Sequence, residues 1–179
     1  MSKKIAVIVG SLRRESLNRK LASALAELGS GFASFDILPL GDVPMFNQDL
    51  EDDVPAPVLQ MREGVRAADA LLFLTPEYNR GVPAVMKNAV DWCSRPTGKG
   101  VLAGKSAALG GMSPGAVGTA VAQSQLKPVL LMLGVRLMGQ PELYIHGGAD
   151  YFDAGGKVAD ENNRRFLINF IKRFEAWIG

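Results

Sequence analysis

A short run of β-branched and small apolar residues, Ile5-Ala6-Val7-Ile8-Val9, is followed directly by a glycine. A continuous apolar run of this length is typical of a strand that is buried on both faces of a parallel sheet. After a polar turn, leucines at 17, 21, 25 and 28 have the spacing of an amphipathic helix, with Ser16 at the N-cap position. These residues predict a strand–turn–helix unit, the building block of a parallel sheet covered by helices.

The same unit recurs along the rest of the chain. Further strands are predicted at 32–38, 70–74, 106–109 and 143–145. Further helices are predicted at 58–67, 83–93 and 117–133, and over the last residues, where Phe166, Phe170, Phe174 and Trp177 fall on one stripe. Pro128 is expected to kink or interrupt the helix 117–133. The alternation predicts a single α/β domain over residues 1–179, with a parallel sheet and helices on both of its faces.

Charge and composition narrow the classes of function. The formal net charge is +2 and the basic residues are spread along the chain, without the concentrated basic face of a nucleic-acid-binding protein. The single cysteine, Cys93, and the single histidine, His146, exclude an internal disulfide and a cysteine- or histidine-rich metal site. The apolar run that ends at Val9 is too short for a signal peptide or a membrane span, so we expect a cytoplasmic protein.

Three polar turns follow predicted strands, at residues 10–18, 75–82 and 110–118. Ligands in parallel α/β sheets bind beyond the carboxyl ends of the strands, so we expect these turns to build the site. The first turn offers the hydroxyls of Ser11 and Ser16, the amide of Asn18 and the guanidinium of Arg13, a set that suits a terminal monophosphate. Taken alone, this turn also admits a purely structural interpretation, in which Ser16 caps the helix and Arg13 is solvated.

Other phosphate motifs do not fit. A dinucleotide-binding turn needs Gly-x-Gly-x-x-Gly after the first strand, and only Gly10 is present. Gly104-Lys105-Ser106 resembles the end of a nucleotide P-loop, but Lys99 stands where the motif needs its first glycine. In contrast, Tyr78 in the second turn and the small residues around Ser113 in the third leave room for a flat ring. A monophosphate and a flat ring together suggest flavin mononucleotide (FMN).

Two longer stretches carry a specific pattern of residues. They are Gly10-Ser11-Leu12-Arg13-x-x-Ser16-x-Asn18 and Pro76-Glu77-Tyr78-Asn79-x-x-Val82-Pro83-x-x-x-Lys87-Asn88-Ala89-x-Asp91-Trp92. Both closely resemble the NAD(P)H-dependent FMN reductases, a family that includes bacterial quinone, azo-dye and chromate reductases. The resemblance implies a three-layer flavodoxin-like fold with a five-stranded parallel sheet in the order 2-1-3-4-5.

The resemblance also implies a role for each matching position. The FMN phosphate would be held by Ser11, Arg13, Ser16, Leu17 and Asn18. The isoalloxazine ring would lie along Pro76, Glu77, Tyr78 and Asn79, with Ser113 near its polar edge. Hydride would pass from NADPH or NADH to FMN, and then to a small-molecule acceptor such as a quinone, an azo dye, chromate or free flavin, in a ping-pong order. The flavin would carry the chemistry, so no catalytic side chain is expected.

A second copy of the chain is the implied partner. In the family, the loop that matches 43–49 reaches the partner's site across a dimer interface, and the helix 83–93 supplies part of the contact. Met45 and Phe46, apolar residues in the irregular stretch 39–57, either pack into their own domain or serve this interface. Small residues fill 115–124, where some relatives use Arg and Tyr to join dimers into tetramers, so the resemblance supports a dimer and does not extend to a tetramer.

Two other functions stay open at this point, a flavodoxin-type electron carrier without direct nicotinamide turnover and a flavin-free binding module. Flavodoxin-type carriers tend to be acidic, and the net charge of +2 argues against that class. Arg80 has two interpretations, a contact to a nicotinamide-nucleotide phosphate or an ordinary solvated side chain.

Overall fold

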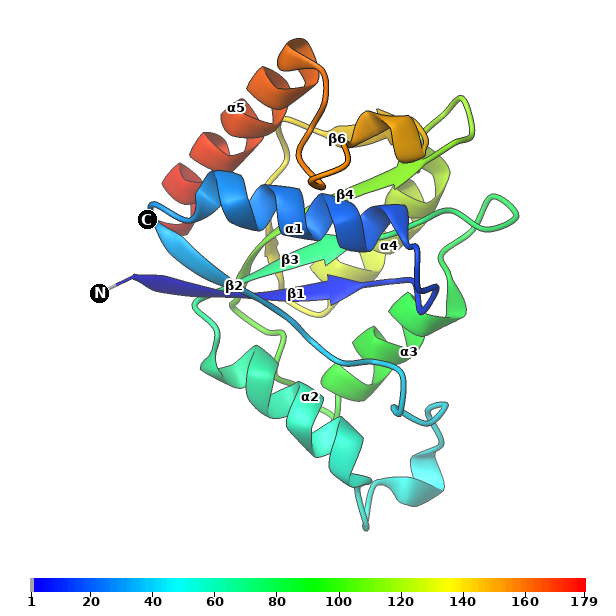
Figure 1. Cartoon of the computed structure of the whole chain (residues 1–179). Coiled ribbons are helices and arrows are strands. Elements are labelled where there is room, and N and C mark those ends of the chain that lie inside the picture. Colours follow the sequence, from blue (N-terminus) through cyan, green and yellow to red (C-terminus); the bar gives the residue numbers. More distant parts are fainter. Residues whose placement is uncertain (1) are drawn as a thin grey trace.

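The apolar runs form the strands of one parallel sheet in the computed structural model, which describes residues 2–179 (Figure 1). The strands are β1 (Lys3–Val9), β2 (Ala33–Ile37), β3 (Ala70–Leu74), β4 (Ser106–Ser113), β5 (Arg136–Leu137) and β6 (Leu143–His146). The helices are α1 (Leu17–Gly29), α2 (Ala56–Ala67), α3 (Ala84–Cys93), α4 (Ala120–Met132) and α5 (Glu161–Ile178), with short 3₁₀ turns at Gln48–Leu50 and Ala149–Tyr151. None of the helices within residues 2–179 is both long and apolar enough to cross a membrane.

The strand order is β2-β1-β3-β4-β5, and β6 also pairs with β4. This confirms the predicted order, with one difference at the fifth position. Two short strands share that position: Arg136 of β5 pairs with Ser106, and Leu143 of β6 pairs with Gly110 further along β4. The sequence predicted only the second of them, because β5 has two residues and no apolar run to mark it.

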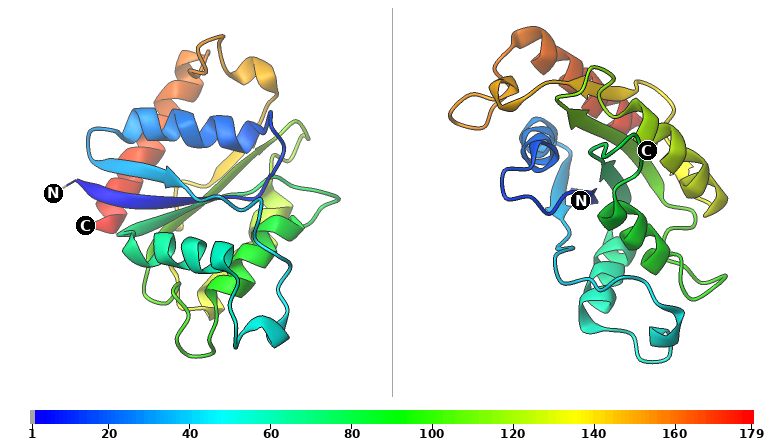
Figure 2. Two further views of the ribbon diagram at one scale, coloured as in Figure 1. Left: turned by 60° about the horizontal axis from the view of Figure 1, so that its bottom comes forward. Right: turned by 90° about the vertical axis from the view of Figure 1, so that its right-hand side faces the viewer.

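Helices cover both faces of the sheet, as predicted. Figures 1 and 2 show α1 and α5 on one side and α2, α3 and α4 on the other. Successive side chains of a strand point to opposite faces; accordingly, Ile5, Val7 and Val9 of β1 enter the core under α1 and α5, whereas Ala6 and Ile8 enter the other core. Burial on both faces is the reason for the continuous apolar runs in the sequence.

Two helices differ from their prediction. In α5 the buried positions are Leu167, Phe170, Ile171 and Phe174, whereas Phe166 and Trp177 are each 38% exposed, so the predicted stripe is wrong at both of its ends. α4 begins at Ala120 and continues through Pro128 without interruption. Proline has no N–H, so Pro128 cannot donate the usual helix hydrogen bond to the Ser124 carbonyl. Ser124 and Pro128 are both exposed, so water can bond to that carbonyl instead.

The topology brings the carboxyl ends of β1, β3 and β4 side by side, as the right-hand view of Figure 2 shows. The third predicted turn is shorter than expected, since Gly110, Gly111 and Met112 continue β4 and pair with β6. A Cβ atom at Gly111 would lie 2.1 Å from the Thr75 carbonyl oxygen and 2.3 Å from the Thr119 hydroxyl. Glycine therefore lets β4 pass directly beneath the turn after β3 and the start of α4.

Candidate functional site

The turn between β1 and α1 presents two serine hydroxyls whose own hydrogens are free to donate. The Ser16 Oγ accepts the N–H of Arg19 at 3.3 Å as the N-cap of α1. The Ser11 Oγ accepts the Tyr78 hydroxyl at 3.3 Å and the Arg13 N–H at 3.4 Å. Both serines are buried, and neither donates to a protein group within residues 2–179. Two free O–H donors beside the N-terminus of a helix form an environment for an anion.

Asn18 has a different part from the other residues of this turn. Its Nδ2 donates to the Met112 carbonyl at 2.9 Å, and its Oδ1 accepts the Met112 N–H at 2.9 Å. The side chain is 1% exposed. The Oδ1 and one of the two Nδ2 hydrogens thus fasten the first turn to β4, and the second Nδ2 hydrogen stays available for a phosphate oxygen.

The turn after β3 is a tight hairpin with an uncommon backbone. Tyr78 and Gly81 exchange backbone hydrogen bonds of 3.3 and 3.0 Å, while Asn79 and Arg80 between them have φ values of +52° and +61°. Turns with two positive φ values usually contain glycine at the second central position, and this one has Arg80. Each such residue costs on the order of 1–3 kcal/mol in strain, which the surroundings must offset. The Tyr78 side chain stands at the rim of the site, 52% exposed.

Glu77 joins this turn to α4. Its Oε2 accepts the N–H groups of Val121 and Ala122, both at 3.0 Å, and its Oε1 pairs with Arg80 at 3.0 Å. The Glu77 side chain is 4% exposed. The side chain of Thr119, the N-cap residue of α4, does not cap the helix. Glu77, which lies in the turn after β3, instead provides the negative charge that stabilises a helix N-terminus. Arg80 is thereby paired within the turn.

The third turn is held by short local contacts. The Ser113 Oγ accepts the Gly115 N–H at 3.1 Å, and the His146 Nδ1 lies 3.0 Å from the Gly115 carbonyl oxygen. His146 therefore tethers the loop after β4 to the end of β6, and it lies outside the cavity formed by the three turns.

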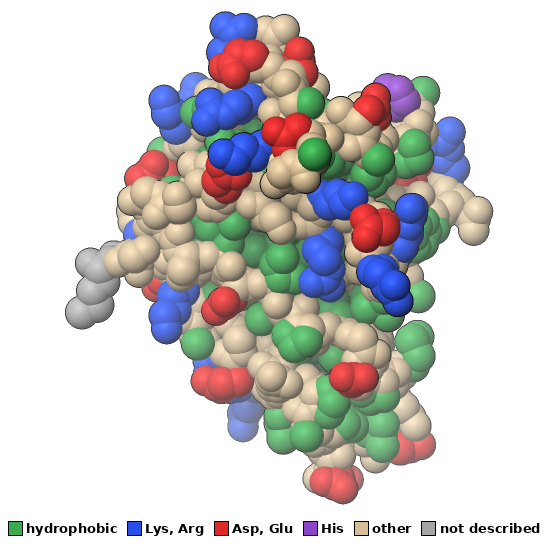
Figure 3. Space-filling model, in the orientation of Figure 1, with side chains coloured by type: hydrophobic (Ala, Val, Ile, Leu, Met, Phe, Trp, Pro, Cys, Tyr) green, Lys and Arg blue, Asp and Glu red, His purple; other side chains and the backbone are tan. Residues whose placement is uncertain are grey.

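The three turns enclose one cavity of about 250 Å³. Nine of the ten predicted cofactor residues line it, namely Ser11, Arg13, Ser16, Leu17, Asn18, Pro76, Glu77, Tyr78 and Ser113. Asn79, the tenth, is exposed and does not line the cavity. Met112 and Pro114 line it and were missed, although they flank Ser113 in the sequence. Figure 3 shows basic side chains gathered over the start of α1, where Arg13, Arg14 and Arg19 are exposed.

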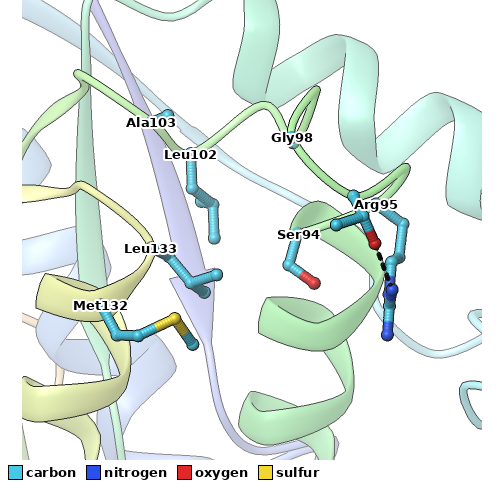
Figure 4. A pocket seen from close by; sticks show the side chains of 9 residues that line it. Ser94, Arg95, Gly98, Leu102, Ala103, Met132 and Leu133 are labelled. Carbon is cyan, nitrogen blue, oxygen red and sulfur yellow. Dashed lines mark hydrogen bonds between the residues drawn. The ribbon is translucent and has the colours of Figure 1, made fainter.

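A larger cavity, of about 420 Å³, lies at the opposite edge of the sheet. Figure 4 shows Ser94, after α3, across from Met132 and Leu133, at the end of α4. α3 and α4 run back against the strand direction, so their last residues lie at the amino edge of the sheet, away from the three turns. The P-loop-like Lys105 is structural, because its Nζ donates to the Arg66 carbonyl at 2.9 Å and to that of Ala68, at the end of α2.

Met45 and Phe46 separate in the structure. Asn88 and Trp92 of α3 donate to the Pro44 carbonyl at 2.9 and 2.8 Å, and the Asn88 Oδ1 accepts the Phe46 N–H at 2.7 Å. The Phe46 ring packs edge-on against Trp92, with ring centroids 4.9 Å apart, whereas Met45 is 68% exposed. Phe46 therefore belongs to its own domain, and Met45 is presented outward on a firmly held loop.

Cys93 lies in the core under α3, as expected. It is fully buried, and burial raises the pKa of its thiol to about 12. A thiol that stays protonated at neutral pH is a poor nucleophile, so Cys93 has no part in the site.

Comparisons with known proteins agree with this geometry. A sequence model of the family described as NADPH-dependent FMN reductase matches residues 3–150. A 2-hydroxy-1,4-benzoquinone reductase of Burkholderia sp is 46% identical over 178 residues, which are 99% of this chain and 97% of that protein. A quinone reductase of Pseudomonas putida is 43% identical over 175 residues, or 97% and 94% of the two chains. Among solved structures, FerB, a flavoenzyme NAD(P)H:(acceptor) oxidoreductase from Paracoccus denitrificans, has a TM-score of 0.94 and 45% identity, over 98% of this chain and 97% of that one.

Proposed function

Because this chain belongs to the NADPH-dependent FMN reductase family, we propose that it oxidises NAD(P)H through bound FMN and reduces quinones in a ping-pong order. Family membership makes it an oxidoreductase with FMN as cofactor and NAD(P)H as co-substrate. The finer parts of the proposal are the acceptor, the order of the half-reactions and the residue roles.

The observation that carries the residue roles is the pair of free serine hydroxyls at the start of α1. Ser11 and Ser16 each accept a hydrogen bond from the protein and keep their own hydrogen for a phosphate oxygen. Arg13, on the cavity wall, adds a fork of charged donors. A monophosphate, with its three terminal oxygens, suits this donor set, so the residues present fit the phosphate end of FMN.

The turns after β3 and β4 would receive the ring. Pro76 and Tyr78 offer apolar and aromatic surface on one side of the cavity, and Ser113 and Pro114 line another. When bound, the flavin supplies the hydride chemistry, and the protein supplies position and electrostatics. No acid–base side chain is required for that chemistry.

The proposed acceptors are quinones, since two of the relatives described above carry a quinone in their names. Azo dyes, chromate and free flavin are further candidates of the same kind, because an open flavin site discriminates weakly among acceptors. The proposed compartment is the cytoplasm.

We also propose a homodimer, with the 43–49 loop and the 83–93 helix at its interface. Three large apolar side chains near this region are exposed in the single chain: Leu12 at 52%, Met45 at 68% and Tyr78 at 52%. A hollow of about 130 Å³ lies between Leu12, Met45 and Val85. Exposed apolar surface next to a hollow is typical of a protein interface.

Steady-state kinetics of the flavin-loaded protein test the proposed function most directly. NADPH and NADH are each assayed against a panel of benzoquinones, azo dyes, chromate and free FMN. Parallel lines in double-reciprocal plots are expected for a ping-pong order. A yellow protein that oxidises neither nucleotide in the presence of a quinone would support the flavodoxin-type carrier. A colourless protein whose melting temperature FMN does not change would contradict the FMN site itself.

A further inference from the structure

The turn that carries Tyr78 depends on α4 for its conformation. Asn79 and Arg80 both lie in the left-handed region of backbone space, at φ +52° and +61°. Residues other than glycine persist there only where neighbouring structure holds them. The two backbone bonds between Tyr78 and Gly81 close the turn but do not attach it to the rest of the molecule.

Gln125, in the second turn of α4, makes the attachment at the far end. Its Nε2 donates to the Arg80 carbonyl at 3.0 Å, and its Oε1 accepts the Val82 N–H at 3.3 Å. Both polar atoms of the side chain are used, and both partners are backbone groups of the turn. Gln125 is exposed and does not line the cavity.

We propose that Gln125 is a positioning residue for the flavin, because it clamps the left-handed turn to α4 and so sets where Tyr78 stands at the cavity rim. Glu77 fastens the near end of the turn through the N–H groups of Val121 and Ala122. With both ends held, the turn and the start of α4 form one rigid unit beside the third turn. The identity of the ligand rests on the proposed function, whereas the clamp rests on the hydrogen bonds alone.

The clamp acts locally. Gln125 and Arg80 are exposed, so water can replace the amide when Gln125 is removed, and no buried donor or acceptor is left without a partner. The global unfolding equilibrium is therefore expected to change little. The opening of the turn, a local equilibrium with a free energy of its own, is expected to change more.

Gln125→Ala tests the clamp, with Ser124→Ala as its matched control. Ser124 is the preceding residue of α4, is also exposed, and its hydroxyl donates to the Val121 carbonyl of its own helix. In the flavin-free chain, amide hydrogen exchange over 78–82 is expected to quicken about three- to tenfold in Gln125→Ala, as the loss of one or two ordinary hydrogen bonds predicts. In Ser124→Ala it is expected to stay unchanged.

With FMN, the dissociation constant of Gln125→Ala is expected to rise by a similar factor, about three- to tenfold, with a shift in the visible spectrum of the bound flavin. Gln125→Glu still accepts the Val82 N–H but cannot donate to the Arg80 carbonyl, so it too should quicken exchange relative to wild type.

Two results would overturn the proposal while leaving the proposed function intact. One is unchanged exchange over 78–82 in Gln125→Ala; the other is unchanged FMN affinity despite faster exchange. A wild-type chain that does not bind FMN would overturn the proposed function and this role together, which is a different pattern of results.

Discussion

Ser11 and Ser16 illustrate how one hydroxyl serves both a fold and a ligand. A hydroxyl has one hydrogen to donate and two lone pairs that accept. Each of these serines accepts a hydrogen bond from the protein, donates none within residues 2–179, and lines the cavity. The structural interpretation of Ser16 as a helix cap is therefore correct and is compatible with phosphate binding.

Arg13→Ala is expected to weaken FMN binding about ten- to a hundredfold, because it removes a charge-assisted hydrogen bond. Fluorescence titration of the apoprotein with FMN measures the change. Arg14→Ala is the control, since Arg14 is also exposed but does not line the cavity. Equal effects of the two substitutions would indicate general electrostatics and would remove Arg13 from the site.

Glu77→Ala is expected to lower the free energy of unfolding by about 3 kcal/mol, because it leaves two N–H groups of α4 and the Arg80 guanidinium without their carboxylate. Urea denaturation followed by circular dichroism measures the loss. Glu63→Ala is the control: that carboxylate is 66% exposed and pairs with Arg66 at the surface. It should cost about 0.5 kcal/mol or less. Similar costs for both variants would show that Glu77 does not cap α4.

At the scale of elements, β4 is the strand on which the site is built. Asn18 ties α1 to it at Met112, and Thr75 and Thr119 lie directly over Gly111. These contacts let the turns after β1 and β3 and the start of α4 approach one another closely. A side chain at position 111 would separate them.

Gly111→Ala is expected to destabilise the protein by about 3 kcal/mol or more, because the new methyl would overlap the Thr75 carbonyl and the Thr119 hydroxyl. Gly31→Ala is the control, since a Cβ atom there meets nothing within 4 Å. Its stability should stay the same or rise by up to about 1 kcal/mol. Thermal melts of both variants check the difference, and a Gly111→Ala protein as stable as wild type would contradict the close approach.

At the scale of the whole molecule, two groups of exposed apolar side chains differ in where they lie. Leu12, Met45 and Tyr78 lie near the three turns, whereas Leu131 and Met132 lie at the far end of α4, 58% and 75% exposed. Tyr78 lines the cavity of the three turns, Leu12 and Met45 line the hollow of about 130 Å³ beside α3, and Asn88 and Trp92 hold the Met45 loop in place. A rigid loop loses little freedom on binding, which favours association.

Met45→Asp is expected to convert the proposed dimer to monomers, raising its dissociation constant about thirtyfold or more, as for a residue at the centre of an interface. Sedimentation velocity over a concentration series measures this. Because Met45 is 68% exposed in the single chain, the stability of the monomer should not change. Leu59→Asp, at an exposed leucine of α2, should leave the association state unchanged. A wild-type protein that sediments only as a monomer would contradict the dimer.

The sequence by itself determined the order of the elements and the turns that meet, because burial on two faces leaves continuous apolar runs and parallel strands end at one edge. It also supplied the motifs of the family and nine of the residues that line the cavity. These signals are local, and each can be read within a few residues.

The tertiary structure decided what each side chain touches. Asn18 meets Met112 across 94 residues, and Glu77 meets Val121 across 44, and no periodicity records such partners. The same holds for Phe46, which is partly buried against Trp92, and for the split between β5 and β6. Packing and hydrogen bonding between residues far apart in the sequence decide these features. These contacts bring the phosphate-binding turn together with the other two turns to form one site.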